Sequence, residues 1–131
     1  MNESSQENRI PVVWRGNSQK CLRKFLNEAK SNLGYNLDLV QTGKDPLDWK
    51  PFPCSEQGVK ELRTEVTEGF YRVVYYLKIQ GCVVVLHAFQ KSKRRTDKKD
   101  VRTIETRLTR LRKDLESGVF YEELKELQKK K

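Results

Sequence analysis

The sequence predicts a single α+β domain with two N-terminal helices, a small antiparallel sheet and a basic helix after the sheet. Three observations point to this fold class. Apolar residues recur at helical spacing over residues 18–33, strand-like runs separated by turns occupy residues 59–90, and an apolar stripe at helical spacing returns after residue 96. A chain of 131 residues accommodates one such core and leaves no room for a second domain of ordinary size.

The N-terminal part predicts one short strand and a helical pair. Residues 10–14 form a β-branched and aromatic run after a polar leader, which is typical of a strand. Asn17 or Ser18 can then cap a helix whose apolar residues recur at helical spacing. Gly34 interrupts this pattern and apolar residues resume it up to Gly43, so we expect two helices, or one bent helix, with the break at Gly34.

The middle of the chain predicts a three-stranded meander after a proline-rich loop. Residues 43–58 contain three prolines and no apolar periodicity, so we expect an ordered loop there. Residues 59–66 alternate between apolar and polar side chains, which predicts a half-buried strand with one wet side. Residues 70–79 and 82–90 follow as two further strands, each reached through a turn that ends in glycine.

The last third predicts a basic helix and a short amphipathic segment. Thr96 can act as the N-cap, and one apolar stripe then runs along the helix until Gly118 stops it. We therefore expect a disordered leader at residues 1–9, the domain at residues 10–115 and an amphipathic extension at residues 116–131.

The charge of the chain indicates a polyanionic partner. The sequence has 27 Lys and Arg residues against 18 Asp and Glu residues, a formal net charge of +9. Residues 91–113 alone hold eleven basic residues and three acids. A segment of this density attracts phosphate backbones through its potential and through counterion release. The alternative is an ordinary solvated helix face, since basic surface helices are common.

Several classes of protein are excluded by composition. The longest apolar stretch, Val83–Phe89, is far shorter than the roughly 20 residues of a membrane helix. The polar N-terminus has no secretory signal, so we expect a cytoplasmic protein without membrane contact. One histidine and three widely spaced cysteines suggest no metal site, and no phosphate-cradling glycine motif occurs. We therefore expect no metal and no cofactor.

Strand alternation brings basic residues to one face of the predicted meander. Arg63 and Arg72 lie opposite the apolar side chains of adjacent strands, so they can be neighbours. Arg63 is flanked by Glu61 and Glu65 and can instead be a cross-strand ion-pair partner. Arginine offers a planar fork for a phosphodiester. Arg72 is the stronger candidate, because solvation alone poorly explains an arginine amid aromatic and valine residues. Tyr76 shares the face of Arg72 and can stack on a base.

The third strand of the meander adds a histidine and a lysine. With unbroken alternation, His87 shares a face with Val83, Val85 and Phe89, and Lys91 follows just past the strand end. A lone histidine on an apolar strand is more often a core residue than a catalyst, so both roles stay open. The Lys- and Arg-rich segment that begins at Lys91 is a candidate phosphate-binding loop.

Two strings of residues resemble the HigB and RelE superfamily of toxin components. The first is Tyr-Arg-Val-Val-Tyr at residues 71–75, and the second is Leu-His-Ala-Phe-Gln-Lys-Ser-Lys-Arg-Arg-Thr at residues 86–96, followed by a basic helix. The second string is similar to the Leu-His-Ala-Phe-x-Lys-Lys signature of the phage-derived, HigB-like branch. The order of the preceding elements agrees, so the resemblance covers about residues 10–113.

This resemblance implies a RelE-like α+β fold, with two N-terminal helices packed on the antiparallel sheet and a C-terminal helix, and it also implies an activity. Such toxins are metal-independent endoribonucleases that cut mRNA in the ribosomal A site and are held inactive by a tightly bound antitoxin. The resemblance therefore implies an mRNA interferase of a type II toxin–antitoxin system, with mRNA, the ribosome and a helix-turn-helix antitoxin as partners. The alternative is a non-catalytic, phage-related protein of the same fold that binds RNA or a protein. A DNA-binding regulator is a weaker third reading, because no helix-turn-helix pairing precedes the basic helix.

The resemblance also assigns roles to individual residues. The strand arginine of the family corresponds to Arg72, the arginine of its Glu-Leu-Arg motif to Arg63, and the signature histidine to His87. The expected catalytic residues are Arg72, Lys91, Lys93, Arg63 and His87. The expected RNA-binding residues come from the basic loop, the start of the basic helix and one strand tyrosine: Arg94, Arg95, Lys98, Lys99, Arg102 and Tyr76.

Overall fold

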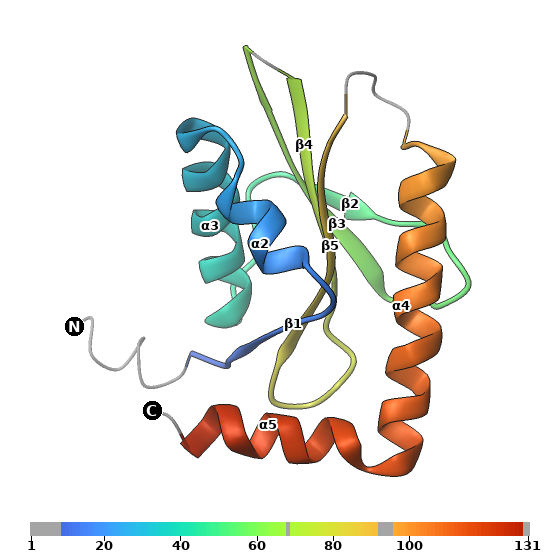
Figure 1. Cartoon of the computed structure of the whole chain (residues 1–131). Coiled ribbons are helices and arrows are strands. Elements are labelled where there is room, and N and C mark those ends of the chain that lie inside the picture. Colours follow the sequence, from blue (N-terminus) through green and yellow to red (C-terminus); the bar gives the residue numbers. More distant parts are fainter. Residues whose placement is uncertain (1–8, 68, 92–95, 130–131) are drawn as a thin grey trace, which may run out of the picture.

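The computed structural model describes residues 9–67, 69–91 and 96–129. Over these residues the protein has an α+β fold in which helices lie on both sides of a five-stranded sheet (Figure 1). In chain order the elements are β1 (Val12–Trp14), α2 (Ser18–Arg23), α3 (Asn27–Gln41), β2 (Trp49–Pro51), β3 (Val59–Val66), β4 (Gly69–Tyr76), β5 (Val83–Lys91), α4 (Lys98–Ser117) and α5 (Val119–Lys129).

The sheet is mixed, which corrects the prediction of an antiparallel sheet. Its strand order is β1-β5-β4-β3-β2. Strands β3, β4 and β5 form the predicted antiparallel meander, and the segment predicted as a loop contributes the edge strand β2. The first strand pairs in parallel with β5, with Val12 beside Val83. Alternation within a segment shows which side chains share a face, but it does not show which strand lies alongside, so the parallel pair escaped prediction.

The break between the first two helices lies earlier than predicted. Helix α2 ends at Arg23 and α3 begins at Asn27, after Leu26 adopts a non-helical conformation (φ −53°, ψ 147°). Gly34 lies inside α3, where it is exposed and where an added Cβ would meet no atom within 4 Å. An exposed helix interior tolerates a glycine at a modest cost, so the interruption of the apolar pattern at Gly34 does not end the helix.

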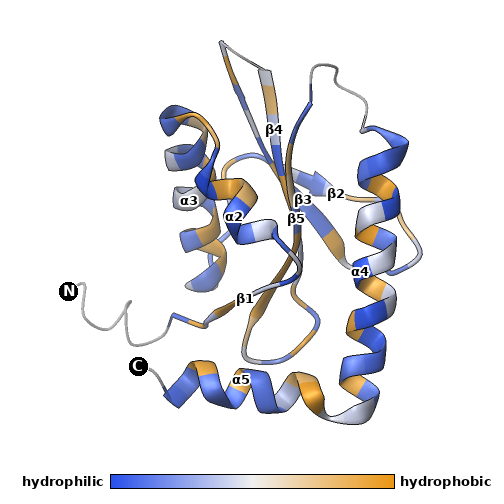
Figure 2. Cartoon of the chain, viewed as in Figure 1, coloured by the Kyte–Doolittle hydropathy of each residue, from blue (hydrophilic) through white to orange (hydrophobic). Residues whose placement is uncertain are grey.

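Two apolar cores lie on opposite faces of the sheet. Helices α2 and α3 cover one face, where Leu62, Tyr71 and Val73 are buried. The basic helix predicted after the sheet is α4, and its buried residues Ile104 and Leu108 pack against the other face. Figure 2 shows hydrophilic residues along the outer side of α4. The helices therefore flank both faces, whereas the prediction described only two helices packed on the sheet.

A β-bulge interrupts β5. His87 lies opposite Val74, whereas the next residue of β4 lies opposite Val85. Leu86 is therefore an extra residue without a partner in the ladder, as expected of a bulge. Its backbone carbonyl instead accepts a hydrogen bond from Nη1 of Arg107 on α4, at 2.8 Å.

The bulge corrects the predicted position of His87. Unbroken alternation places His87 on the face of Val83, Val85 and Phe89. In the structure, Val83 and Val85 belong to the core under α2 and α3, whereas Phe89 belongs to the core under α4. His87 also faces α4, where its ring contacts Asp100, because the extra residue shifts the alternation by one position.

The C-terminal extension packs with the rest of the structure. Gly118 ends α4, as predicted, and it adopts a left-handed conformation (φ 86°). Phe120 of α5 is fully buried in the core under α4. Arg15 donates hydrogen bonds to Asp114 at 2.5 Å and to Glu123 at 3.4 Å. These bonds tie the corner between α4 and α5 to the residue that follows β1.

Of the predicted leader at residues 1–9, only Arg9 lies within the described residues. Arg9 forms an ion pair with Asp38 of α3. The next residue, Ile10, donates its backbone N–H to the Gln41 carbonyl at 3.0 Å and accepts a hydrogen bond from the Gln41 side chain at 2.8 Å. In the described part of the chain, no helix is both long and apolar enough to cross a bilayer.

Two glycines provide a matched test of this architecture. Gly16 has a φ of +57°, and a Cβ there would overlap the Arg107 guanidinium, so we expect Gly16→Ala to lower the free energy of unfolding by at least about 1 kcal/mol. Gly34→Ala, in an open helical position, should raise it by about 0.5–1 kcal/mol. Urea unfolding of both variants measures the two changes. Equal effects of the two substitutions would contradict the assigned backbone conformations.

Candidate functional site

Four basic side chains from four neighbouring strands gather on the sheet face that α4 partly covers. They are Lys50 of β2, Arg63 of β3, Arg72 of β4 and Lys91 of β5, and we call them the cation cluster. The register places Arg63 directly opposite Arg72, and Lys50 directly opposite Glu61. The sequence predicted that Arg63 and Arg72 can be neighbours and that Lys91 lies just past its strand, whereas Lys91 is the last residue of β5 and Lys50, expected in a loop, lies in β2.

Arg72 lies deep in the cation cluster, with 2% of its surface exposed. Its Nη1 donates a hydrogen bond to the backbone carbonyl of Tyr71 at 3.0 Å, and its Nε lies 3.8 Å from Oε2 of Glu61. Its guanidinium carbon is 5.9 Å from the ring centroid of Phe70. Burial lowers the pKa of Arg72, and the neighbouring Glu61 carboxylate opposes this change.

Glu61 is the acidic centre of the cluster. Alternation predicted that Glu61 lies on the solvent-exposed side of its strand, but the residue is 1% exposed. Its Oε2 lies 3.5 Å from Nζ of Lys50 and 3.8 Å from Nε of Arg72, and its Oε1 is buried without a hydrogen-bond partner in the described structure. The prediction failed because β2 and β4 flank β3 on both sides and because basic side chains cover this part of the face.

The remaining cations differ in their access to solvent. Lys91 is 6% exposed, and its Nζ donates to the Thr96 hydroxyl at 3.2 Å. Burial lowers the pKa of Lys91, and repulsion from Arg72 adds to this change. The Arg63 side chain is partly exposed and its Nε lies 3.4 Å from Asp48, while Lys50 is half exposed. The cluster therefore has a buried floor of Arg72 and Lys91 and an accessible rim of Lys50 and Arg63.

The electrostatics of the cluster favour an anion. The cluster brings four cations to one buried carboxylate, Glu61, which lies 3.5 Å from Lys50 and 3.8 Å from Arg72, while Arg63 lies 3.4 Å from Asp48. Positive charge held between apolar walls is weakly screened, so its attraction for an anion is stronger than on an open surface. A hollow that Arg63 shares with Asn32 and Tyr35 of α3 is also lined by Asp48 and Glu65, so it does not extend this positive region.

His87 lies beside this floor, between the sheet and α4. Its Nε2 is 2.8 Å from Oδ1 of Asp100, its Nδ1 is 3.4 Å from Nη1 of Arg107, and its ring stacks on Phe89 with centroids 4.9 Å apart. A carboxylate can only accept and a guanidinium can only donate, so a neutral ring with its proton on Nε2 satisfies both partners. Burial lowers the pKa of His87, and Asp100 opposes this change.

The other predicted RNA-binding residues fall into three groups. Tyr76 donates its hydroxyl proton to Glu56 at 3.1 Å, so its polar end is tied to the loop before β3. The exposed residues Lys98, Lys99 and Arg102 lie on the first turns of α4. The predicted loop residues Lys93, Arg94 and Arg95 lie outside the described residues.

The residues that sequence reasoning missed lie on different helices or strands from the residues that they contact. Lys50, Asp100 and Arg107 are close to Glu61 and His87 only because β2 and α4 return to the sheet. One signal was visible in the sequence, because Asp100 is acidic within an otherwise basic helix start. In the structure it contacts His87, the only histidine of the chain.

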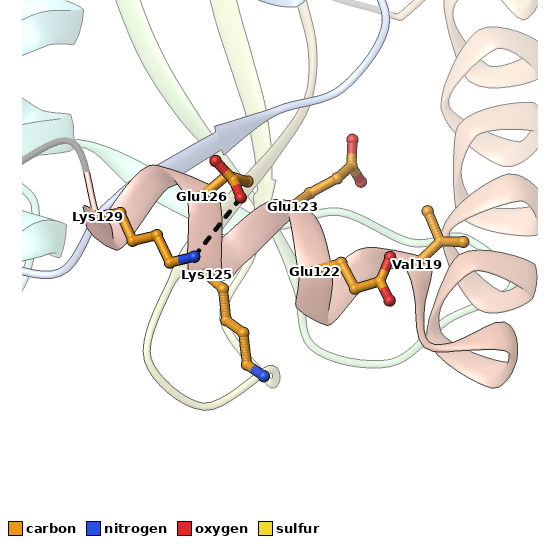
Figure 3. A pocket seen from close by; sticks show the side chains of 6 residues that line it. All are labelled: Val119, Glu122, Glu123, Lys125, Glu126 and Lys129. Carbon is orange, nitrogen blue, oxygen red and sulfur yellow. Dashed lines mark ion pairs between the residues drawn. The ribbon is translucent and has the colours of Figure 1, made fainter.

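A second hollow lies along α5, far from the cation cluster. Figure 3 shows its lining, which comes from α5 alone and includes Glu122, Glu123 and Lys125. Lys129 lies 3.9 Å from Glu126 in an exposed ion pair. In Figure 1, α5 lies at the end of the sheet opposite to the hairpin between β3 and β4. Side chains from one exposed helix do not converge on a ligand, so this hollow is not part of the candidate site.

Comparisons with known proteins identify one matching family. Residues 20–109 match the family described as "Phage derived protein Gp49-like (DUF891)". No curated protein matches the chain. Among solved structures, the toxin–antitoxin complex RelBE2 from Mycobacterium tuberculosis is similar at 20% sequence identity and a TM-score of 0.46, over 65% of this chain and 94% of that chain. A structural similarity of this degree does not carry function from that complex to this chain.

The environment of His87 predicts a pH dependence of stability. Because the folded pKa lies below the ordinary value of 6.5, the contribution of His87 is present above that pH and is lost as the pH falls through the folded pKa. We expect the free energy of unfolding to fall between about pH 7.5 and about pH 5.5, with a slope of up to about 1.4 kcal/mol per pH unit from this one proton.

His87→Gln serves as the comparison for that measurement. Urea unfolding of this variant at the same pH values should show a smaller dependence on pH, because Asp and Glu side chains titrate mostly below this window. An unchanged dependence in His87→Gln would assign the effect to another group.

Proposed function

Since residues 20–109 match it, the chain belongs to the Gp49-like family of phage-derived proteins, and on this premise we propose that it is the toxin of a type II toxin–antitoxin pair. The proposed activity is metal-independent cleavage of mRNA in the ribosomal A site, which stops translation. The observation that carries this proposal is the convergence of four basic side chains on one sheet face, one of them from β5, the strand in which the toxin-like string of residues 86–96 begins.

The cation cluster supplies what an RNA phosphodiester needs for cleavage. The 2′-hydroxyl must lose a proton, the phosphate gains negative charge as it becomes pentavalent, and the leaving oxygen must gain a proton. In the proposed reaction Arg72 stabilises the phosphate charge, Arg63 positions the backbone, and Lys91 and Lys93 bind phosphate or transfer a proton. The lowered pKa of Lys91 favours proton transfer, because it brings the pKa of the ammonium group closer to neutral pH.

The burial of the floor explains why the ribosome is part of the proposal. Arg72 and Lys91 are almost inaccessible, whereas Lys50 and Arg63 lie at the rim. A flexible RNA must adopt an in-line geometry to reach the floor, and a template that holds the strand contributes that orientation. We expect weak activity on free RNA for this reason. The exposed first turns of α4, together with Arg94 and Arg95, are proposed to hold the RNA backbone.

His87 has no place in this reaction scheme. Both ring nitrogens face protein groups, Asp100 and Arg107, and the ring stacks on Phe89. We assign His87 to the attachment of α4 to the sheet. The proposed antitoxin, a helix-turn-helix protein, follows from the resemblance of the residues to known toxins and from no contact in the structure.

A second candidate function is supported by the same burial. The two cations of the floor are covered, while Lys98, Lys99 and Arg102 are exposed on α4. A protein that only binds RNA, or a protein partner, would use the exposed set and would not need Arg72. The two functions therefore predict different effects of changes at Arg72.

Arg72→Lys tests the catalytic role of the guanidinium. This change keeps a positive charge near Glu61 but removes the planar fork, so we expect loss of growth inhibition and cleavage slower by about 100-fold or more. Complete truncation is a poorer test, because a buried Glu61 without its partner costs about 3–5 kcal/mol of stability. Growth curves after induction, with circular dichroism to check folding, measure the effect.

Arg110→Lys is the matched control for Arg72→Lys. The Arg110 side chain is 74% exposed and lies outside the cation cluster, so the same substitution there should leave growth inhibition intact. A folded Arg72→Lys protein that inhibits growth as strongly as the unchanged chain would reject the role given to Arg72.

Primer extension on cellular mRNA separates cleavage from binding. After induction, the proposed nuclease should leave breaks at A-site codons, and Arg72→Lys should leave none. Growth arrest without breaks would instead support the binding function, because a protein that only occupies RNA leaves the strand intact.

A further inference from the structure

The carboxylate at the centre of the cation cluster has no part in the reaction proposed above. Glu61 is 1% exposed, and one of its oxygens, Oε1, is buried without a hydrogen-bond partner among the described residues. Burial of an ionised carboxylate is costly unless nearby charges compensate it. The compensation here comes from Lys50 at 3.5 Å and Arg72 at 3.8 Å, both measured from Oε2.

Two of the three nitrogens of the Arg72 guanidinium face groups of the protein. Its Nη1 donates to the Tyr71 carbonyl at 3.0 Å, and its Nε faces Glu61. Within the described part of the chain, Nη2 makes no hydrogen bond and is not completely buried. One nitrogen of the fork therefore remains for a ligand.

Repulsion acts on Arg72 from the other members of the cluster. Arg63 lowers the pKa of Arg72, and Arg72 in turn lowers the pKa of Lys91, so the three cations are close enough to disfavour one another. Among the groups that act on Arg72 from nearby, Glu61 is the strongest attractive one. Without this carboxylate, repulsion would drive the guanidinium away from the floor.

We propose that Glu61 is a positioning residue, whose buried carboxylate fixes the Arg72 guanidinium so that its remaining nitrogen meets the phosphate of the RNA. This inference rests on the proposed function. Glu61 itself does not touch the RNA; it acts through Arg72. A donor that is already fixed where negative charge develops needs no reorganisation during the reaction, which is the source of most electrostatic catalysis.

Glu61→Gln tests the proposal, because the amide keeps the size of the side chain and removes its charge. We expect kcat for mRNA cleavage on programmed ribosomes to fall by about 100-fold, the scale of a small misplacement of a catalytic group. Binding to the same ribosomes should be unchanged or tighter, because the positive patch gains one net charge. A merely structural role would weaken binding and cleavage together.

Glu65→Gln is the matched control on the same strand and the same face. Glu65 also attracts Arg72, but more weakly than Glu61, because water screens its exposed charge, so we expect kcat to fall far less than in Glu61→Gln while binding gains the same net charge. A Glu61→Gln protein with unchanged kcat overturns the proposal. If Glu61→Gln does not fold, Glu61→Asp replaces it: the charge is kept but withdrawn from Arg72 by one methylene, and an unchanged kcat in that variant overturns the proposal as well.

Nuclear magnetic resonance of the Arg72 side chain tests the positioning without any assay of cleavage. In the unchanged chain, the Nη protons of Arg72 should give separate signals, because the guanidinium rotates slowly when it is held. These signals should merge in Glu61→Gln and stay separate in Glu65→Gln. Separate signals in Glu61→Gln would overturn the proposal. If the unchanged chain cleaves no mRNA, the proposed function fails, and the Arg72 signals alone decide whether Glu61 positions this residue.

Discussion

The contact between Glu61 and Arg72 is the interaction on which the candidate site depends. Both side chains are buried in the middle of the sheet, and their closest charged atoms are 3.8 Å apart without a hydrogen bond. A buried ion pair adds little net stability, because desolvation of both charges offsets most of the attraction. The ion pair instead determines how the charged side chains are arranged, since a carboxylate at this position allows Arg72 and Lys91 to lie side by side on one face. An apolar residue in place of Glu61 would leave the buried cations uncompensated.

The second constraint is the attachment of α4 to the sheet. Arg107 connects α4 to two other segments, because it donates to Asn17 at 2.7 Å and to the Leu86 carbonyl at the bulge of β5, where it also faces His87. Asp100 holds the other side of the histidine. The exposed basic turns at the start of α4 are thereby fixed relative to the cation cluster. Helix α4 therefore serves both the fold and the proposed function, because its inner side packs in the core and its outer side carries charge.

Local patterns predicted the elements better than they predicted the site. Alternation marked residues 59–66 as a strand, and β3 has these bounds, because a strand with one apolar face repeats every second residue. The common face of Arg63 and Arg72 followed from the same rule. The rule failed at His87, since a bulge shifts the alternation and leaves no mark in composition.

The environment of each charged residue could not be read from the sequence. Glu61 looks like a wet-side residue, and its burial depends on the strands on either side and on Lys50, which returns from a segment without periodicity. The partners of His87 lie on α4 and are brought to β5 only by the packing of that helix. Predictions from one segment at a time describe faces, whereas a site is built between segments. The basic residues Lys93, Arg94 and Arg95 lie outside the described structure, so their contribution remains a prediction.

The parallel pairing of β1 with β5 has a consequence for synthesis of the protein. Val12 is placed beside Val83, so the first strand has no partner until most of the chain has been made. Phe120 then completes the core from the last helix. Pairings between distant parts of a chain form late and fold slowly. The described core therefore closes only after β1, β5 and α5 have all been made, so a fragment that lacks α5 leaves the core around Phe120 open.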